Sequence, residues 1–212
     1  ERSPALTLRL GRRTFATGET VVMAIVNRTP DSFYDKGATF SDDAALEAVD
    51  RVVDEGAGIV DIGGVKAGPG AAVDAAEEIR RTASLVAAIR ARHDVVISVD
   101  TWRAEVGRVV CAEGADLLND AWGGWDPELA AVAAEFGVGL VCTHTGAAEP
   151  RTRPHRVEYA DVMADVVERT VAQVERLLAT PVEDSPALLP VPADDDDGRE
   201  RAAEAVRTSV TP

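Results

Sequence analysis

The sequence is poor in aromatic residues, cysteine, histidine and positive charge. Aromatic side chains make up 4% of the 212 residues, and the chain has two cysteines and three histidines. The two cysteines, Cys111 and Cys142, are too few for a disulfide framework and do not have the spacing of a metal motif. Buried apolar thiols are therefore expected at both positions.

Two further absences exclude whole classes of function. Lysine and arginine number 22 against 37 aspartate and glutamate residues, giving a formal net charge of −15. Because nucleic-acid binding needs basic surface to neutralise phosphates, this charge argues against nucleic acid as a partner. No apolar run reaches about 18 residues, so no membrane-spanning helix and no membrane partner are expected. The first residues lack an initial methionine and a signal-peptide core, which indicates a fragment or processed chain and a cytoplasmic protein by default.

What the chain does contain is a regular alternation of apolar runs and amphipathic segments. The runs typical of buried strands are 21–26, 58–64, 95–100, 117–120 and 139–145. The segments with helical spacing are 42–55, 74–91, 102–112, 127–136 and 157–179, with Ser41 and Thr101 as expected caps. Strict alternation predicts an α/β fold with a parallel sheet, either a barrel or a doubly wound sheet.

The alternating region forms one predicted domain, residues 21–180. Residues 1–20 are expected to be a lead-in to it. Residues 181–212 are acidic and rich in proline, a composition that predicts a poorly ordered tail. No sixth strand is predicted there.

Each predicted strand ends in a polar group. These groups are Asn27, Asp61, Asp100, Asn119 with Asp120, and His144. Because the carboxyl ends of parallel strands meet at one rim, the groups are expected to converge. An aspartate or asparagine at such a place is often only a cap or a turn residue. Within this set, Asp61, Asp100 and Asn119 are candidates for holding a flat heterocycle by its amine and amide edges.

Anion binding is expected beside this set. The neutral oxygen of Asn27 suits a Mg²⁺ shell shared with waters and a substrate phosphate. The glycine-rich loop 63–70 allows close backbone approach to an anion, and Lys66 adds positive charge, although such a loop is equally typical of a plain connection. His155 lies among Arg151, Arg153 and Arg156, a group that suits either an anion or a solvated loop.

Five segments of the chain resemble dihydropteroate synthase. They are Asn27-Arg28-Thr29-Pro30-Asp31-Ser32-Phe33, Asp61-Ile62-Gly63-Gly64, Ser98-Val99-Asp100-Thr101, Asn119-Asp120 with Gly123-Gly124, and His144. Their order and spacing resemble the family's over residues 21 to 160. The resemblance implies a (β/α)8 TIM barrel with only about five units legible here, and an enzyme of folate biosynthesis. Such an enzyme joins 4-aminobenzoate to 6-hydroxymethyl-7,8-dihydropterin diphosphate and releases diphosphate with the help of Mg²⁺.

The resemblance also implies roles for individual residues. Asn27 matches the contact to Mg²⁺ and diphosphate, Asp100 and Asn119 match contacts to the pterin ring, and Asp61 lies near the pterin. The first loop, which helps shape the 4-aminobenzoate site, is represented by Thr29, Asp31, Ser32 and Phe33. The family's reaction resembles SN1, so no side-chain nucleophile is required and none is assigned.

Two departures from the family bear on activity. Its second loop reads Gly-Gly-Glu-Ser-Thr-Arg-Pro-Gly, whereas Gly68 stands here in place of the arginine. Lys66, two positions away, is a poor geometric substitute for a guanidinium that grips diphosphate through two hydrogen bonds. The motifs of the last three barrel units are also missing after Thr180, and five units cannot close an eight-stranded barrel.

Three functions therefore stay open at the level of sequence. The chain is an active synthase, a pterin-binding paralogue with lost or changed catalysis, or a partial barrel that needs a partner. The last of these predicts self-association through open sheet edges. A truncated gene, a frame shift and a wall supplied by another chain would each explain the missing units.

Overall fold

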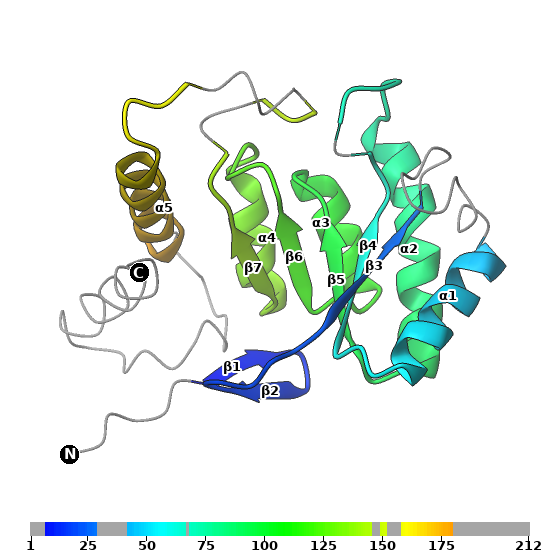
Figure 1. Cartoon of the computed structure of the whole chain (residues 1–212). Helices are drawn as coiled ribbons and strands as arrows, with labels where there is room; N and C mark the ends of the chain where they lie inside the picture. The colour runs from blue at the N-terminus through cyan, green and yellow to red at the C-terminus, as the bar shows by residue number, and fades with distance from the viewer. Residues whose placement is uncertain (1–6, 29–41, 67, 146–148, 152–157, 180–212) are drawn as a thin grey trace, which may run out of the picture.

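A computed structural model describes residues 7–28, 42–66, 68–145, 149–151 and 158–179 (Figure 1). It contains a five-stranded parallel sheet in the order β3-β4-β5-β6-β7. The strands are β3 (Met23–Asn27), β4 (Ile59–Gly63), β5 (Val96–Asp100), β6 (Leu117–Asp120) and β7 (Gly139–Cys142). Their spatial order follows the chain, as in a stretch of barrel wall, whereas a doubly wound sheet reverses its order part-way.

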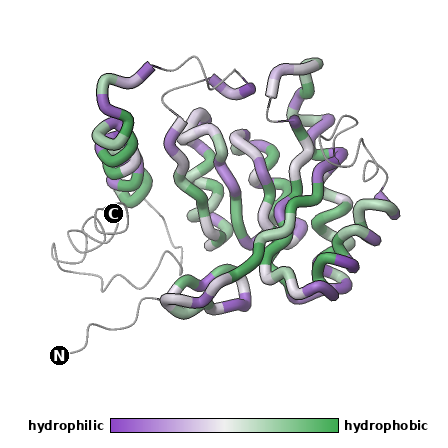
Figure 2. The backbone as a smooth tube through the Cα atoms, viewed as in Figure 1, coloured by the Kyte–Doolittle hydropathy of each residue, from purple (hydrophilic) through white to green (hydrophobic). Residues whose placement is uncertain are grey.

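Helices alternate with these strands and cover one face of the sheet. They are α1 (Asp42–Asp54), α2 (Ala75–Arg92), α3 (Ala104–Ala112), α4 (Glu128–Phe136) and α5 (Val162–Leu178). Figure 1 shows α3 and α4 behind the sheet, α1 and α2 on the side of β3, and α5 beside β7 at the other edge. The main core lies between sheet and helices, and Ile62, Ile97 and Leu118 are fully buried there. The tube in Figure 2 is largely hydrophobic along β3, and hydrophobic stretches also occur along the helices.

Two predicted helix starts differ from the structure. Thr101 does not cap a helix that begins at Trp102, because α3 begins at Ala104 with Arg103 at the cap position. The oxygen that accepts from the first helical N–H of Ala104 is the carboxylate of Asp126, at 2.8 Å. Trp102 instead packs edge-on against Trp122, with ring centroids 6.2 Å apart.

The last helix is also shorter at its start than predicted. The side chain of Asp161 accepts a hydrogen bond from the backbone N–H of Ala164 at 3.0 Å, which sets the first turn of α5 at Val162. The expected cap Ser41 and the expected tail 181–212 lie outside the described residues. No helix among the described residues is both long enough and apolar enough to cross a membrane.

The expected lead-in contains an element that no sequence pattern predicted. β1 (Thr7–Leu10) and β2 (Arg13–Ala16) form an antiparallel hairpin, seen at the bottom of Figure 1. Leu10 and Phe15 pack with Ile59, Val96 and Leu117 in a second, smaller core. The hairpin thus covers the amino-terminal end of the sheet face opposite the helices.

One edge of the sheet is apolar and open to solvent. In and beside β3, Val22 is 60% exposed and Ile25 is 66% exposed. Strand edges of this kind invite pairing with another chain. The expected self-association has this support, and it stays a prediction.

The hairpin gives a matched stability test within one strand. Leu10 is 3% exposed and contacts the second core, whereas Leu8, two residues earlier, is 50% exposed. Leu10→Ala removes buried apolar atoms and is expected to lower the free energy of unfolding by about 3 kcal/mol. Leu8→Ala is expected to lower it by less than about 0.5 kcal/mol. Urea denaturation of both variants measures the difference, and equal losses would contradict the hairpin's packing.

Candidate functional site

Strand register brings the predicted site residues to one level of the sheet. Asn27 pairs with Gly63, Gly63 with Asp100, and Asp100 with Asn119, at the carboxyl ends of four neighbouring strands. These positions share the face opposite the helix-packed core. The prediction that Asn27, Asp100 and Asn119 converge is therefore confirmed.

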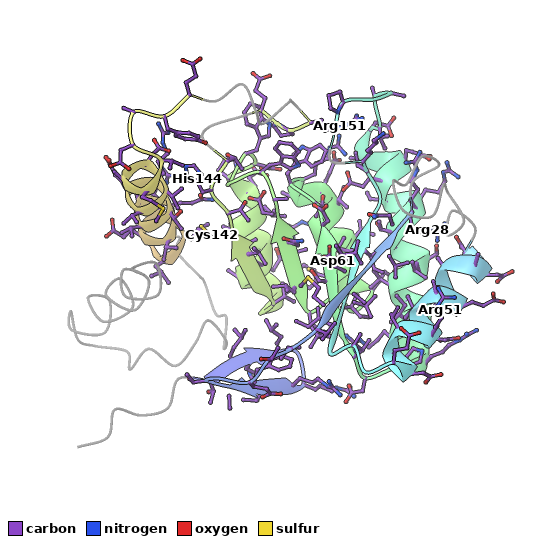
Figure 3. The ribbon with its side chains drawn as sticks, viewed as in Figure 1. Arg28, Arg51, Asp61, Cys142, His144 and Arg151 are labelled. Carbon is purple, nitrogen blue, oxygen red and sulfur yellow. The ribbon has the colours of Figure 1, made fainter. Side chains whose placement is uncertain are left out.

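Asp61 lies two residues before Gly63 on β4 and points to the same face (Figure 3). The hydroxyl of Ser98 donates to its Oδ1 at 2.5 Å, and Nδ2 of Asn119 lies 3.3 Å from the same oxygen. Ser98 is fully buried and Asp61 is 5% exposed. A serine and an asparagine from the next two strands thus fix the orientation of the carboxylate.

The site is rich in buried negative charge. Burial raises the pKa of Asp61 despite its hydrogen bonds from Ser98 and Asn119. The pKa of Asp100 rises to about 7, first through burial and then through the charges of Asp61, Glu78 and Asp120. Near neutral pH Asp100 can therefore either donate or accept a hydrogen bond.

A buried ion pair lies behind these residues. Glu78 of α2 is fully buried and accepts a hydrogen bond from Nη1 of Arg103. Nη2 of Arg103 donates to the backbone carbonyl of Val73 at 2.8 Å. The pair links α2, the start of α3 and the end of the second loop, so it holds together the scaffold under Asp100.

Two of the strand-end groups do not join the set. The carboxylate of Asp120 accepts from the backbone N–H groups of Trp122 and Gly124 at 2.8 and 2.6 Å, so it shapes its own loop. Nε2 of His144 lies 2.7 Å from Oδ1 of Asp165, on α5 (Figure 3). The expectation that all strand-end groups converge is thus wrong for these two, because local and helix contacts occupy them.

The second loop begins with two closely packed glycines, Gly63 and Gly64. A Cβ on Gly63 would lie 2.7 Å from Oδ1 of Asn27, and a Cβ on Gly64 would lie 2.8 Å from Thr82. Arg81 donates to the carbonyl of Gly64 at 2.9 Å. Lys66, expected to add charge, is exposed on this loop.

Asn27 is the residue expected to contact a metal. Its Oδ1 is a neutral oxygen at the end of β3, a suitable type of ligand for Mg²⁺. Among the described residues, no group of three or more histidine, cysteine, aspartate or glutamate side chains could hold a metal ion. The neutral oxygen of Asn27 fits a Mg²⁺ shell in which water and phosphate oxygens would supply the other ligands. The other predicted first-loop residues, Thr29, Asp31, Ser32 and Phe33, lie outside the described residues.

Comparison with known proteins gives the family of this chain. Residues 23–189 match the family described as "Pterin binding enzyme". The chain belongs to this family. Over 175 residues the chain is 55% identical to a Mycobacterium leprae protein named "Inactive dihydropteroate synthase 2", a match that covers 80% of this chain and 60% of the relative. A Mycobacterium tuberculosis protein of the same name is 58% identical over 163 residues, covering 76% and 51%.

Solved structures agree with the sequence comparison. The dihydropteroate synthase of Yersinia pestis, in complex with a sulfonamide drug, superposes with a TM-score of 0.76 at 32% identity, covering 84% of this chain and 64% of that one. The predicted (β/α)8 barrel type is thereby confirmed, and the resemblance to dihydropteroate synthase with it. The chain spans only 60% and 51% of the two mycobacterial relatives, so it matches part of their length.

Asp61 and Asn119 were predictable from the sequence, whereas Ser98, Glu78 and Arg103 were missed as site residues. Ser98 stands two residues before Asp100, and this alternation alone places both on one face of a strand. That signal was available. Glu78 and Arg103 gave none, because their pairing joins a helix interior to a loop 25 positions away.

Asp100 gives a pH-dependent stability with a defined sign. Its pKa rises from an ordinary 3.8 to about 7, so the folded chain binds this proton more tightly than the unfolded chain does. Its stabilising effect is complete below the ordinary value and is lost as the pH rises through about 7. Between pH 5 and 7, Asp100→Asn is expected to make the fall in unfolding free energy shallower by about 1 kcal/mol per pH unit. Urea denaturation at several pH values measures both slopes.

The matched control is Asp94→Asn, which alters an exposed carboxylate just before β5, at the strand's other end. It is expected to leave the slope as in the unaltered chain. If Asp100→Asn gives the same slope as Asp94→Asn, Asp100 does not have the raised pKa.

Proposed function

We propose that this chain binds a reduced pterin ring on the inner face of its sheet, which is the face opposite the helix-packed core. The observation that carries the proposal is the carboxylate of Asp61, fixed by Ser98 and Asn119, with Asp100 beside it. A pterin presents N–H donors along one edge, which suit carboxylates, and an amide such as Asn119 can donate and accept. The dihydropteroate synthase of Burkholderia cenocepacia, solved with 7,8-dihydropteroate, supports this at 33% identity and a TM-score of 0.68.

Charge favours the same class of ligand. The site holds several carboxylates whose pKa values burial raises, so each is costly to ionise in the empty chain. N–H donors of a bound ring would stabilise the ionised form of Asp61 and Asp100. Part of the binding free energy would therefore come from relieving the repulsion between these two groups.

Mg²⁺, diphosphate and 4-aminobenzoate are the finer parts of the proposal. Mg²⁺ would neutralise the leaving diphosphate, and Asn27 would contribute a neutral side-chain oxygen to its shell. The 4-aminobenzoate site would involve Thr29, Asp31, Ser32 and Phe33. The dihydropteroate synthase of Xanthomonas albilineans, solved with 4-aminobenzoic acid, supports this at 31% identity.

Turnover is proposed to be weak even where the pterin binds. In the reaction the bond between the pterin methylene carbon and the diphosphate oxygen breaks with the electron pair on diphosphate, and the amine nitrogen then bonds to that carbon and loses a proton to water. Charge grows on the diphosphate as it leaves, and the family's second-loop arginine position is Gly68 here. Loss of one well-placed hydrogen-bond donor to the developing negative charge typically lowers the rate about 100-fold. The mycobacterial relatives carry the word "inactive" in their names.

Calorimetric titration with 6-hydroxymethyl-7,8-dihydropterin tests the binding. Asp61→Asn keeps the shape of the side chain and removes the charge that accepts the ring's N–H groups. It is expected to weaken binding at least about tenfold, the cost of losing hydrogen bonds to a charged group. Asp94→Asn, the same change outside the site, is expected to bind as the unaltered chain does. No heat of binding in the unaltered chain would refute the proposal.

A turnover assay separates binding from catalysis. With pterin diphosphate, 4-aminobenzoate and Mg²⁺, the chain is expected to form dihydropteroate at least about 100-fold more slowly than the Yersinia pestis enzyme assayed in parallel. Weak turnover beside measurable pterin binding is the result that fits a paralogue with lost catalysis. Equal rates would show an active synthase.

A further inference from the structure

Three arginines hold the second loop, residues 64–73, by its backbone carbonyls. Arg81 donates to Gly64, Arg103 donates to Val73, and Arg151 donates to both Lys66 and Ala71. Arg81 and Arg103 lie in or beside the helices that flank the loop. Arg151 comes from the segment after β7, 80 positions further along the chain than Ala71.

The backbone at Arg151 is unusual for an arginine. Its φ is 65°, and it is the one non-glycine residue with positive φ in the described part of the chain. Side chains disfavour this conformation, so local contacts must hold it. Nε of Arg151 lies 3.3 Å from the Lys66 carbonyl and Nη1 lies 2.9 Å from the Ala71 carbonyl.

The loop has room for this guanidinium. A Cβ on Gly70 would lie 3.1 Å from Nη2 of Arg151, so glycine permits the close approach. At Gly68 a Cβ would meet nothing within 4 Å, which leaves open space where the family resemblance expects an arginine. Figure 3 shows Arg151 above the carboxyl ends of the strands, over the same end of the sheet at which the site residues lie.

We propose that Arg151 and Lys66 form an anion subsite that receives the diphosphate of a pterin diphosphate. Arg151 supplies from a different segment the guanidinium that the second loop lacks at Gly68. This inference rests on the proposed function, since the pterin ring on the inner face would direct its diphosphate arm toward the rim. Lys66, exposed on the same loop, adds the second positive charge.

The geometry also sets the limit of this subsite. Nε and Nη1 of Arg151 are engaged with backbone carbonyls, so the side chain cannot turn its paired Nε and Nη edge to a phosphate. Arg151 therefore offers a phosphate its positive charge and one nitrogen, Nη2, but not two parallel hydrogen bonds. Such a subsite favours binding of the ester without restoring the transition-state contact that fast turnover requires.

The test compares the pterin diphosphate with the pterin alcohol, 6-hydroxymethyl-7,8-dihydropterin, by calorimetry. The unaltered chain is expected to bind the diphosphate at least about tenfold more tightly. Arg151→Gln keeps a donor for the loop carbonyls and removes the charge. It is expected to reduce this preference several-fold and to leave the affinity for the alcohol unchanged.

Two further variants sharpen the comparison. Arg151→Gln combined with Gly68→Arg puts a guanidinium back on the loop itself and is expected to restore the preference for the diphosphate. Arg80→Gln makes the same change at an exposed arginine of α2, whose side chain is 72% exposed, and is expected to change nothing. An unchanged preference for the diphosphate in Arg151→Gln would overturn the inference. An equal loss of affinity for both ligands would also overturn it, because it would show that Arg151 only stabilises the loop.

Failure of the proposed function gives a different result. If the unaltered chain binds neither pterin, the pterin proposal fails, and titration with inorganic diphosphate then decides the subsite by itself. Weaker diphosphate binding by Arg151→Gln than by Arg80→Gln would support the subsite. Equal binding by these two variants would overturn it.

Discussion

A shift of one residue in the pairing of β4 with β5 would turn one of the two strands over, so that either Asp61 or Asp100 would point toward the helices and the main core. Side chains alternate between the two faces of a strand, so register decides which face receives every polar group. In the observed register, Asp61 is level with Ser98, and Gly63 is level with Asp100. The hydrogen bond from Ser98 to Asp61 exists only in this pairing. Everything that the site can bind depends on it.

The same register concentrates negative charge, and this has a cost. Asp61, Glu78, Asp100 and Asp120 all have raised pKa values, with burial the largest cause in each. Glu78 has a cationic partner in Arg103, whereas the hydrogen bonds to Asp61 from Ser98 and Asn119 come from neutral groups. A domain that stabilised itself alone would gain from replacing such groups with apolar ones. The presence of Asp61 and Asp100 on the face opposite the helices is understandable if a ligand rich in N–H donors completes their hydrogen bonding.

Much of the fold and part of the site could be predicted from local patterns. The five strand-helix units follow from apolar periodicity, and Asn27, Asp100 and Asn119 follow from their places at strand ends. Contacts between distant segments were not accessible in this way. Asp126 caps α3 from 22 positions further along, and that contact moves the helix start past Thr101. The hairpin likewise had no local pattern that predicted it, because the burial of Leu10 and Phe15 depends on strands far along the chain.

The second loop shows how a chain of this family can change its anion contacts while keeping its shape. Arginines at both ends and across its middle bind carbonyl oxygens, which every residue type provides, so the identity of the side chains at positions 66 to 68 matters little for the path of the backbone. The side chain of Val65 is buried, whereas a Cβ at position 68 would have no neighbouring atom within 4 Å. Glycine in place of the family's arginine at position 68 thus removes a proposed diphosphate ligand and leaves Asp61, Asp100 and Asn119 in place. Binding of the ring and stabilisation of the leaving group are separable in this architecture, because the first depends on strand register and the second on exposed loop side chains.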